Sequence, residues 1–174
     1  MTKGNLMEGK VVWFTGLPCS GKTTIAREVM KRLKEEGYDV ELLDGDVLRS
    51  YVRNTDFSRE GRSKHLRYVA LMAKLLEKRG VIVLCSFVSP YRENREFARS
   101  MCKNFIEVYV KAPIEVCIKR DTKGLYKAAL SGKIKGFTGV DDPYEEPENP
   151  EVVIETDKES VEEGVQKVLR KIFS

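Results

Sequence analysis

One stretch constrains the fold of this chain more than any other: Gly16-Leu17-Pro18-Cys19-Ser20-Gly21-Lys22-Thr23. It follows an apolar run and precedes a helical pattern, which is the context of a loop that binds phosphate groups. Its glycines let backbone N–H groups point inward at an anion, and the following helix adds the positive end of its dipole. A glycine-rich turn that binds nothing is disfavoured, because every fixed position of the motif is present. We therefore expect this whole loop to bind a nucleoside triphosphate.

Two side chains of the loop have expected roles that follow from their chemistry. The ammonium group of Lys22 is long enough to reach β- and γ-phosphate oxygens, and the hydroxyl of Thr23 is a ligand for Mg²⁺. Cys19 is interpreted as a small residue that fits the turn, since the backbone of such a loop makes the contacts.

Apolar runs and helical periods alternate along the chain. The run at residues 81–85 is apolar throughout, as expected for a parallel strand covered on both faces. The alternation predicts an α/β fold of the P-loop NTPase type, with a five-stranded parallel sheet, helices on both faces and one domain over residues 1–174. Strands are expected at residues 11–15, 40–43, 81–85, 105–110 and 152–154, and helices at residues 22–36, 59–79, 93–101, 113–120 and 161–172.

Residues 121–150 interrupt this alternation. They are rich in Gly, Lys, Asp and Pro and have little helical period. A segment of this length without regular structure is usually a functional lid or a disordered insert. Ligands of parallel α/β sheets bind at the carboxyl ends of the strands, so a lid would close over that edge.

Composition narrows the partners and the compartment. The 31 basic against 27 acidic residues give a net charge of +4, a mild excess without the long basic block of a nucleic-acid-binding arm. The cysteines form no C-x-x-C pair, which argues against a zinc site or a disulfide framework. No signal-peptide core and no apolar run of membrane length is present, so we expect a cytoplasmic protein without a membrane partner. The cysteines are Cys19, Cys85, Cys102 and Cys117.

Two carboxylates follow the second expected strand, in the sequence Asp44-Gly45-Asp46. A phosphotransferase needs a carboxylate at the acceptor hydroxyl and acidic groups near Mg²⁺. The alternative is a helix N-cap and turn, in which Asp and Gly are both common. The position after a strand of a P-loop protein favours the catalytic interpretation.

Several arginines follow these carboxylates, together with one aromatic residue. Arginines near the carboxyl end of a strand suit bidentate binding of a phosphate- or sulfate-like group, although a solvated charged face is the default for any one of them. Phe57 is either a core residue under the loop or a platform that stacks on an aromatic ring, and its periodicity does not decide between the two. The arginines are Arg49, Arg53, Arg62 and Arg67.

The segment after the central strand contains Ser89. A serine nucleophile needs a base, and the sole histidine, His65, is not near it in the sequence. In-line phosphoryl transfer needs no covalent intermediate. Ser89 is therefore interpreted as a contact residue rather than a catalyst.

With these motifs in place, the chain resembles the adenylylsulfate kinase family over residues 9–150. The most specific motifs are K-G-L-Y-K in the lid, followed by F-T-G-x-D-D-P-Y-E. The segments that carry the resemblance are residues 16–23, 43–46, 57–58, 89–92, 115–117, 120–126 and 137–145.

The resemblance implies a reaction. Members of this family transfer the γ-phosphate of MgATP to the 3′-hydroxyl of adenosine 5′-phosphosulfate, giving 3′-phosphoadenylylsulfate and ADP in sulfate assimilation. It also implies a homodimer and a functional link to ATP sulfurylase. The alternatives are a kinase of another nucleoside or nucleotide, and an inactive nucleotide-binding partner of a sulfurylase.

The resemblance also implies roles for individual residues. Asp46 is expected to be the base at the acceptor hydroxyl, and Lys22 to contact the phosphates. Thr23 and Asp44 are expected to hold Mg²⁺, partly through water. Ser89 aligns with a serine once assigned as a phosphorylated intermediate.

The acceptor contacts come from the same comparison. Arg49 and Arg62 resemble arginines that hold the phosphosulfate, and Phe57 and Phe137 resemble an aromatic pair that stacks on the acceptor adenine. Lys123 belongs to the closing lid. His65 stands where the family usually has asparagine, and the remaining expected acceptor contacts are Val88 and Ser89.

Overall fold

The apolar run of the first strand lies in the middle of a parallel sheet. The structure is a computed structural model and describes residues 7–174. Within these residues five strands lie in the order β2-β3-β1-β4-β5, and every adjacent pair is parallel. This confirms the predicted fold class. The strands are β1 (Lys10–Thr15), β2 (Val40–Asp44), β3 (Ile82–Ser86), β4 (Phe105–Lys111) and β5 (Val152–Glu155).

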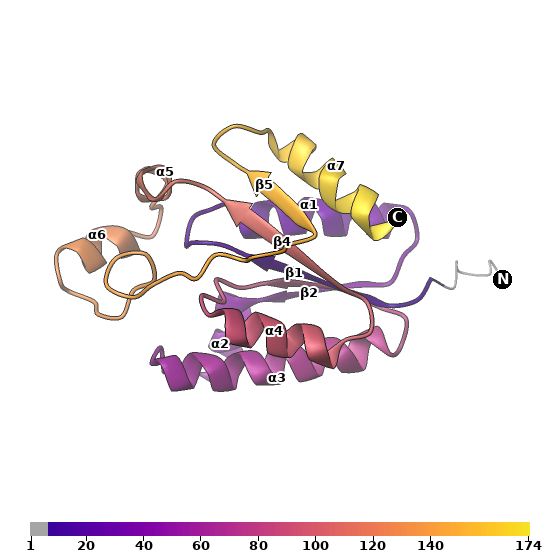
Figure 1. The fold of residues 1–174 in the computed structure, drawn as a ribbon, viewed down its shortest axis with the longest axis horizontal. Helices are drawn as coiled ribbons and strands as arrows, with labels where there is room; N and C mark the ends of the chain where they lie inside the picture. Colours follow the sequence, from indigo (N-terminus) through magenta and orange to yellow (C-terminus); the bar gives the residue numbers. More distant parts are fainter. Residues whose placement is uncertain (1–6) are drawn as a thin grey trace.

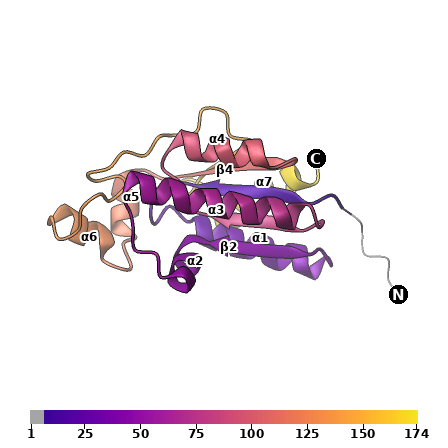
Figure 2. The ribbon, with the colours of Figure 1, turned by 90° about the horizontal axis from the view of Figure 1, so that it is seen from below.

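Helices cover both faces of the sheet, as Figures 1 and 2 show. Val12 and Phe14 of β1 pack under α1 (Lys22–Glu35) and α7 (Val161–Ile172). Val11 and Trp13 point the other way, against α3 (Arg59–Glu77) and α4 (Arg92–Met101). Because successive side chains of a strand point to opposite faces, a strand covered on both sides must be apolar at every position.

The structure contains two short helices that the sequence patterns do not predict, α2 (Gly45–Val52) and α6 (Leu125–Leu130). Helix α2 has eight residues and buries none of them completely, so its apolar positions are too few to establish a helical period. Helix α6 has six residues and starts at Gly124, whose φ of 70° is the left-handed conformation that favours glycine. A helix shorter than two turns has no measurable period, so residues 121–150 looked irregular.

The lid packs on a small apolar cluster of its own. Buried side chains of Ala112, Cys117 and Tyr126 form its centre, and Leu17 and Phe137 pack against them. The cluster joins α5 (Ile114–Lys119) and α6 to the phosphate loop, and in Figure 2 both helices lie beyond the end of the sheet.

None of the helices in residues 7–174 is both long enough and apolar enough to span a membrane. The four cysteines are free thiols in the structure, and two of them are buried.

Candidate active site

The predicted phosphate loop connects β1 to α1. Gly16 is required there because a Cβ atom would lie 2.2 Å from the Val110 carbonyl oxygen of β4. Gly21 starts α1 with a φ of 105°, and the Ser20 amide donates to the Leu17 carbonyl at 3.1 Å. The loop therefore has the tight strand-to-helix turn that the motif predicts.

Lys22 lies inside this loop and is 8% exposed. Its Nζ donates to the carbonyl oxygens of Gly16 at 2.9 Å and Leu17 at 2.8 Å. Burial lowers the pKa of Lys22 from 10.5 to about 8. This shift corresponds to roughly 3 kcal/mol by which the folded chain disfavours the charged ammonium. An anion bound in the loop would offset that cost.

Three oxygen atoms meet at the start of α1. The Thr23 hydroxyl lies 3.0 Å from Asp44 Oδ2 and 3.1 Å from Ser86 Oγ. Asp44 Oδ1 caps α2 by accepting from the amides of Asp46 and Val47. The N-cap interpretation of the Asp-Gly-Asp sequence is therefore confirmed for Asp44, and its position beside Thr23 is compatible with the metal-binding interpretation.

This oxygen cluster fits Mg²⁺, which binds through one or two protein oxygens together with substrate phosphates. No group of three or more His, Cys, Asp or Glu side chains in residues 7–174 could hold a metal ion by itself. Ser86 was not predicted, because a serine at the end of a strand carries no sequence signal.

Asp46 contacts the lid directly. Its Oδ2 accepts a hydrogen bond from Lys123 Nζ at 2.7 Å, and the two side chains are 80% and 63% exposed. The bond to Asp46 raises the pKa of Lys123. The structure therefore brings the predicted base and the predicted lid lysine together at the mouth of the site.

The two predicted acceptor arginines have different surroundings. Arg49 stacks on Phe57, with its guanidinium carbon 4.2 Å from the ring centroid, and donates to the carbonyl oxygens of Asn54 and Asp56. Arg62 is 9% exposed and forms an ion pair with Asp142 of the lid at 2.6 Å. Arg49 is thus at the surface of the site, and Arg62 is built into its wall.

The other two arginines lie at different places. Arg53 is the C-cap of α2, with a φ of 50°. Arg67 stacks on Phe97 of α4 at 4.2 Å from the ring centroid, so the structure places it on the outer helical layer. For Arg67 the charged-surface interpretation is the better one.

Two predicted contact residues are buried. His65 is 7% exposed, its Nε2 has no partner, and burial together with Arg49 lowers its pKa. Ser89 is 3% exposed, accepts from Trp13 Nε1 at 3.0 Å and donates to the Phe87 carbonyl at 3.2 Å. Its hydroxyl is thus engaged by the core, which argues against phosphorylation of Ser89.

The remaining predicted contacts lie around the same edge. The Val88 carbonyl accepts from the Thr15 hydroxyl at 2.7 Å. Phe137 packs edge-on against Tyr126 at 5.0 Å between centroids, while Phe57 is 55% exposed against Arg49. In this conformation, each aromatic residue of the expected pair has a protein neighbour.

Arg120 and Thr156 support the phosphate loop from behind and were not predicted as site residues. Arg120 Nη1 donates to the Thr156 hydroxyl at 3.0 Å and to the Ser20 carbonyl at 3.3 Å. Thr156 donates to the same Ser20 carbonyl at 2.7 Å. The available signal was their position, since Thr156 directly follows the last strand and Arg120 opens the lid motif.

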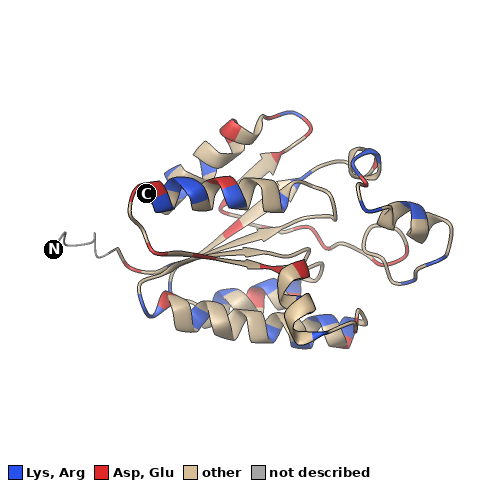
Figure 3. Cartoon of the chain, turned by 180° about the vertical axis from the view of Figure 1, so that it is seen from behind, with Lys and Arg blue, Asp and Glu red and all other residues tan. Residues whose placement is uncertain are grey.

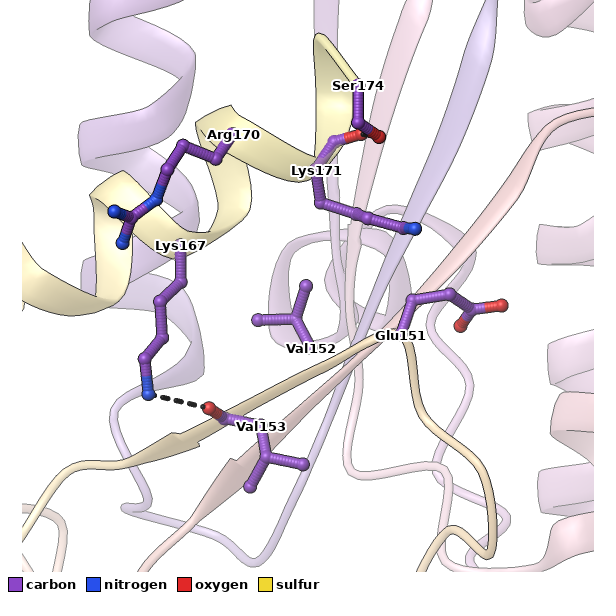
Figure 4. A pocket seen from close by; sticks show the side chains of 7 residues that line it. All are labelled: Glu151, Val152, Val153, Lys167, Arg170, Lys171 and Ser174. Atoms are coloured by element: carbon purple, nitrogen blue, oxygen red, sulfur yellow. Dashed lines mark hydrogen bonds between the residues drawn. The ribbon is translucent and has the colours of Figure 1, made fainter.

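Two cavities lie near the sheet. One of about 390 Å³, between β5 and α7, is lined by Glu151, Lys167 and Arg170 among others, and Figure 4 shows Lys167 bonded to the Val153 carbonyl. It contains none of the predicted site residues. The other, of about 750 Å³, lies between the end of β4 and the lid and includes Leu17 and Asp142.

Charge is distributed unevenly around the lid. Figure 3 colours Lys and Arg positions blue, and several blue stretches lie on and around the short helix α6 that projects from the sheet. Residues 121–150 as a whole carry four Lys against six Asp and Glu, but all four Lys lie within residues 123–135. A basic stretch beside the phosphate loop favours polyphosphate ligands.

The fold and this site define a class of protein. A phosphate loop on a parallel sheet, a carboxylate at its edge and a lid lysine that reaches this carboxylate are the parts of a P-loop phosphotransferase. The family model for adenylylsulphate kinase matches residues 8–155. The chain belongs to the adenylylsulfate kinase family, and its activity is that of an ATP-dependent adenylyl-sulfate kinase of sulfate assimilation.

Individual relatives agree with this assignment. An adenylyl-sulfate kinase of Halothermothrix orenii is 53% identical, covering 93% of this chain and 88% of the relative. A probable adenylyl-sulfate kinase of Pyrococcus abyssi is 51% identical, covering 95% of each chain. The structure of the Mycobacterium tuberculosis APS kinase CysC in complex with AMPPNP and APS superposes with a TM-score of 0.92 at 38% identity, covering 97% of this chain and 99% of that one.

Proposed function

We propose that the chain binds ATP in the loop of residues 16–23 and adenosine 5′-phosphosulfate between Asp46 and the lid, and transfers the γ-phosphate to the acceptor 3′-hydroxyl. The observation that carries this proposal is the 2.7 Å contact between Asp46 and Lys123, which joins the carboxylate beside the phosphate loop to the family-specific lid motif. The Mycobacterium tuberculosis kinase was solved with an ATP analogue and the acceptor, and its fold supports two nucleotide sites here.

On the donor side, Lys22 exchanges its two loop carbonyls for phosphate oxygens and stabilises the charge that develops on the transferred group. The oxygens of Thr23 and Asp44 would hold Mg²⁺, which supplies further neutralisation of phosphate charge. Lys123 lies above the loop, where its ammonium is bonded to Asp46. When Asp46 turns to the acceptor hydroxyl, this ammonium is free to contact the γ-phosphate during its transfer. The lid excludes water, which would otherwise hydrolyse ATP.

On the acceptor side, Asp46 accepts the proton of the 3′-hydroxyl. Arg49 binds the phosphosulfate from the surface and Arg62 from the wall of the site. Phe57 leaves Arg49 and stacks on the adenine, with Phe137 on the other face. His65, Val88 and Ser89 complete this side of the pocket.

An assay of ADP release with a panel of acceptors tests the function. Adenosine 5′-phosphosulfate should give the highest kcat/KM, above adenosine and nucleoside monophosphates. Faster turnover of a nucleoside would favour the alternative kinase, and ATP binding without ADP formation from any acceptor would favour the inactive module.

The buried ammonium of Lys22 makes ATP affinity depend on pH. Below about pH 8 Lys22 is charged in both the free and the bound state. Phosphates raise its pKa in the complex, so above that pH binding must take up a proton and affinity falls by up to about tenfold per pH unit. Titration calorimetry between pH 7.5 and 9.5 measures this slope. Lys22→Arg should bind ATP more weakly and without the slope, and a flat wild-type profile would contradict the assignment.

We further propose a homodimer built on α3. Its outward face carries Tyr68, Leu71, Met72 and Leu75, which are 37–58% exposed and spaced as one helical stripe. A twofold axis through the stripe would pair it with its own copy. Leu71→Glu should convert the dimer to a monomer in size-exclusion chromatography with light scattering, whereas Val161→Glu, at an exposed apolar position of α7, should not. A wild-type monomer would contradict the proposal.

The four unpaired cysteines support a cytoplasmic location, because reduced thiols persist there. The acceptor is itself the product of a reaction that joins sulfate to an adenylyl group. We therefore also propose that the chain is functionally coupled to an ATP sulfurylase.

A further inference from the structure

Asp142 is bound by two residues of the acceptor side at once. Its Oδ2 accepts from Arg62 Nη1 at 2.6 Å and from the Tyr91 hydroxyl at 2.7 Å. Arg62 Nη2 also bonds the carbonyl oxygen of Gly136. Both outer nitrogens of the Arg62 guanidinium are therefore bonded to residues of the lid.

Residues 136–142, which we call the Phe137 loop, are held together by hydrogen bonds within the loop. The Asp141 carboxylate accepts from the amides of Gly136 and Phe137, each at 2.8 Å. The Gly139 amide donates to the Asp142 carbonyl at 2.8 Å, and the Asp142 amide donates to the Phe137 carbonyl at 3.2 Å. Because these bonds fix the loop internally, a tether at Asp142 also sets the place of the Phe137 ring.

The tether is well enclosed. The Arg62 and Asp142 side chains are 11% and 24% exposed, so their ion pair is less screened than the Lys123–Asp46 pair at the mouth of the site. Burial and the bond to Asp142 raise the pKa of Tyr91, which keeps its hydroxyl a donor. Charge-assisted bonds of this kind fix direction as well as distance.

We propose that Asp142 is a positioning residue for acceptor recognition, because it both orients the Arg62 guanidinium and holds the Phe137 loop against the acceptor side of the site. The inference rests on the proposed acceptor site. One carboxylate thereby sets the spacing between the group that binds the acceptor's anion and the ring that stacks on its base. An acceptor that carries an anion at that spacing from an adenine is selected over one that does not.

Steady-state kinetics of Asp142→Asn test this inference. The KM for adenosine 5′-phosphosulfate should rise at least about tenfold, since a displacement of about 1 Å in a positioning group has effects of this size. The KM for ATP and the kcat at saturating acceptor should stay within about threefold. Asp142→Glu, which restores the charge, should recover part of the loss. Tyr91→Phe keeps the ion pair between Arg62 and Asp142, so it should also raise the KM for adenosine 5′-phosphosulfate, but by a smaller factor.

Glu148→Gln is the matched control. Glu148 lies in the lid six residues after Asp142, and it forms an exposed ion pair with Arg92 of α4. It should leave both KM values unchanged. A lower acceptor KM in Asp142→Asn would mean that the carboxylate competes with the acceptor, and equal rises in both KM values would mean general lid damage. Either result overturns the inference while the wild-type enzyme remains active on adenosine 5′-phosphosulfate. A wild type inactive on that acceptor would instead overturn the proposed function, and this inference with it.

Discussion

Asp46→Asn should reduce kcat by about 10²–10⁴-fold, the usual contribution of a general base. The amide keeps the size of the side chain and cannot accept the proton of the acceptor hydroxyl. The KM for ATP should change by less than about threefold, because the proposed donor contacts are Lys22 and the loop backbone. Single-turnover measurement of product with saturating ATP and acceptor gives the rate directly.

Glu41→Gln provides the control for this substitution. Glu41 lies on β2, the strand that ends at Asp44, and is exposed to solvent. Its neutralisation changes the net charge equally and should leave kcat unchanged. An Asp46→Asn enzyme that retained most of its kcat would show that another group accepts the proton.

Gly16→Ala should abolish ATP binding and destabilise the fold. The added Cβ would lie 2.2 Å from the Val110 carbonyl oxygen and 2.8 Å from Ser20 Oγ, so the loop must move away from β4. Since backbone rather than a flexible side chain is in the way, we expect a loss of more than about 2 kcal/mol. For a chain of this size that corresponds to a fall in Tm of roughly 5 °C or more. Thermal unfolding with and without ATP measures both effects.

Gly37→Ala separates crowding from backbone strain. Gly37 has a φ of 88° and no atom within 4 Å of an added Cβ, so its substitution adds only the left-handed strain, about 1 kcal/mol. ATP should still raise the Tm of this variant as it does for the wild type. Gly16→Ala protein with normal ATP binding would show that the loop tolerates a wider turn.

Most of the fold could be predicted from the sequence because its core elements repeat a strong pattern. The apolar β1 run and the helical stripe of α3, with Leu66, Val69, Ala70 and Ala73 buried, are signals of local origin. Helices α2 and α6 escaped prediction because they are shorter than the window in which a period can be measured. Their starts depend on the Asp44 cap and on the backbone conformation of Gly124.

The site could be predicted only where chemistry follows a motif. Lys22 and Thr23 have fixed offsets in the phosphate loop, so their places followed from the sequence. The contact between Asp46 and Lys123 spans 77 positions, and that between Arg62 and Asp142 spans 80. Such contacts depend on how the lid folds back over the sheet, and no local pattern encodes that path. The contact of Ser86 with Thr23 was found only in the structure, because it depends on the adjacent positions of the strand ends.

The small apolar cluster of Ala112, Cys117 and Tyr126 has a consequence for motion. It is separate from the two cores that flank the sheet, so we expect α5 and α6 to unfold locally together while the sheet stays intact. Amide hydrogens of α6 should then exchange with solvent at a lower opening free energy than those of β1 and β3. Access of substrates would then depend on the free energy of local opening, and stability of the fold on the free energy of global unfolding. Substitutions in α5 and α6 can change the first without lowering the second.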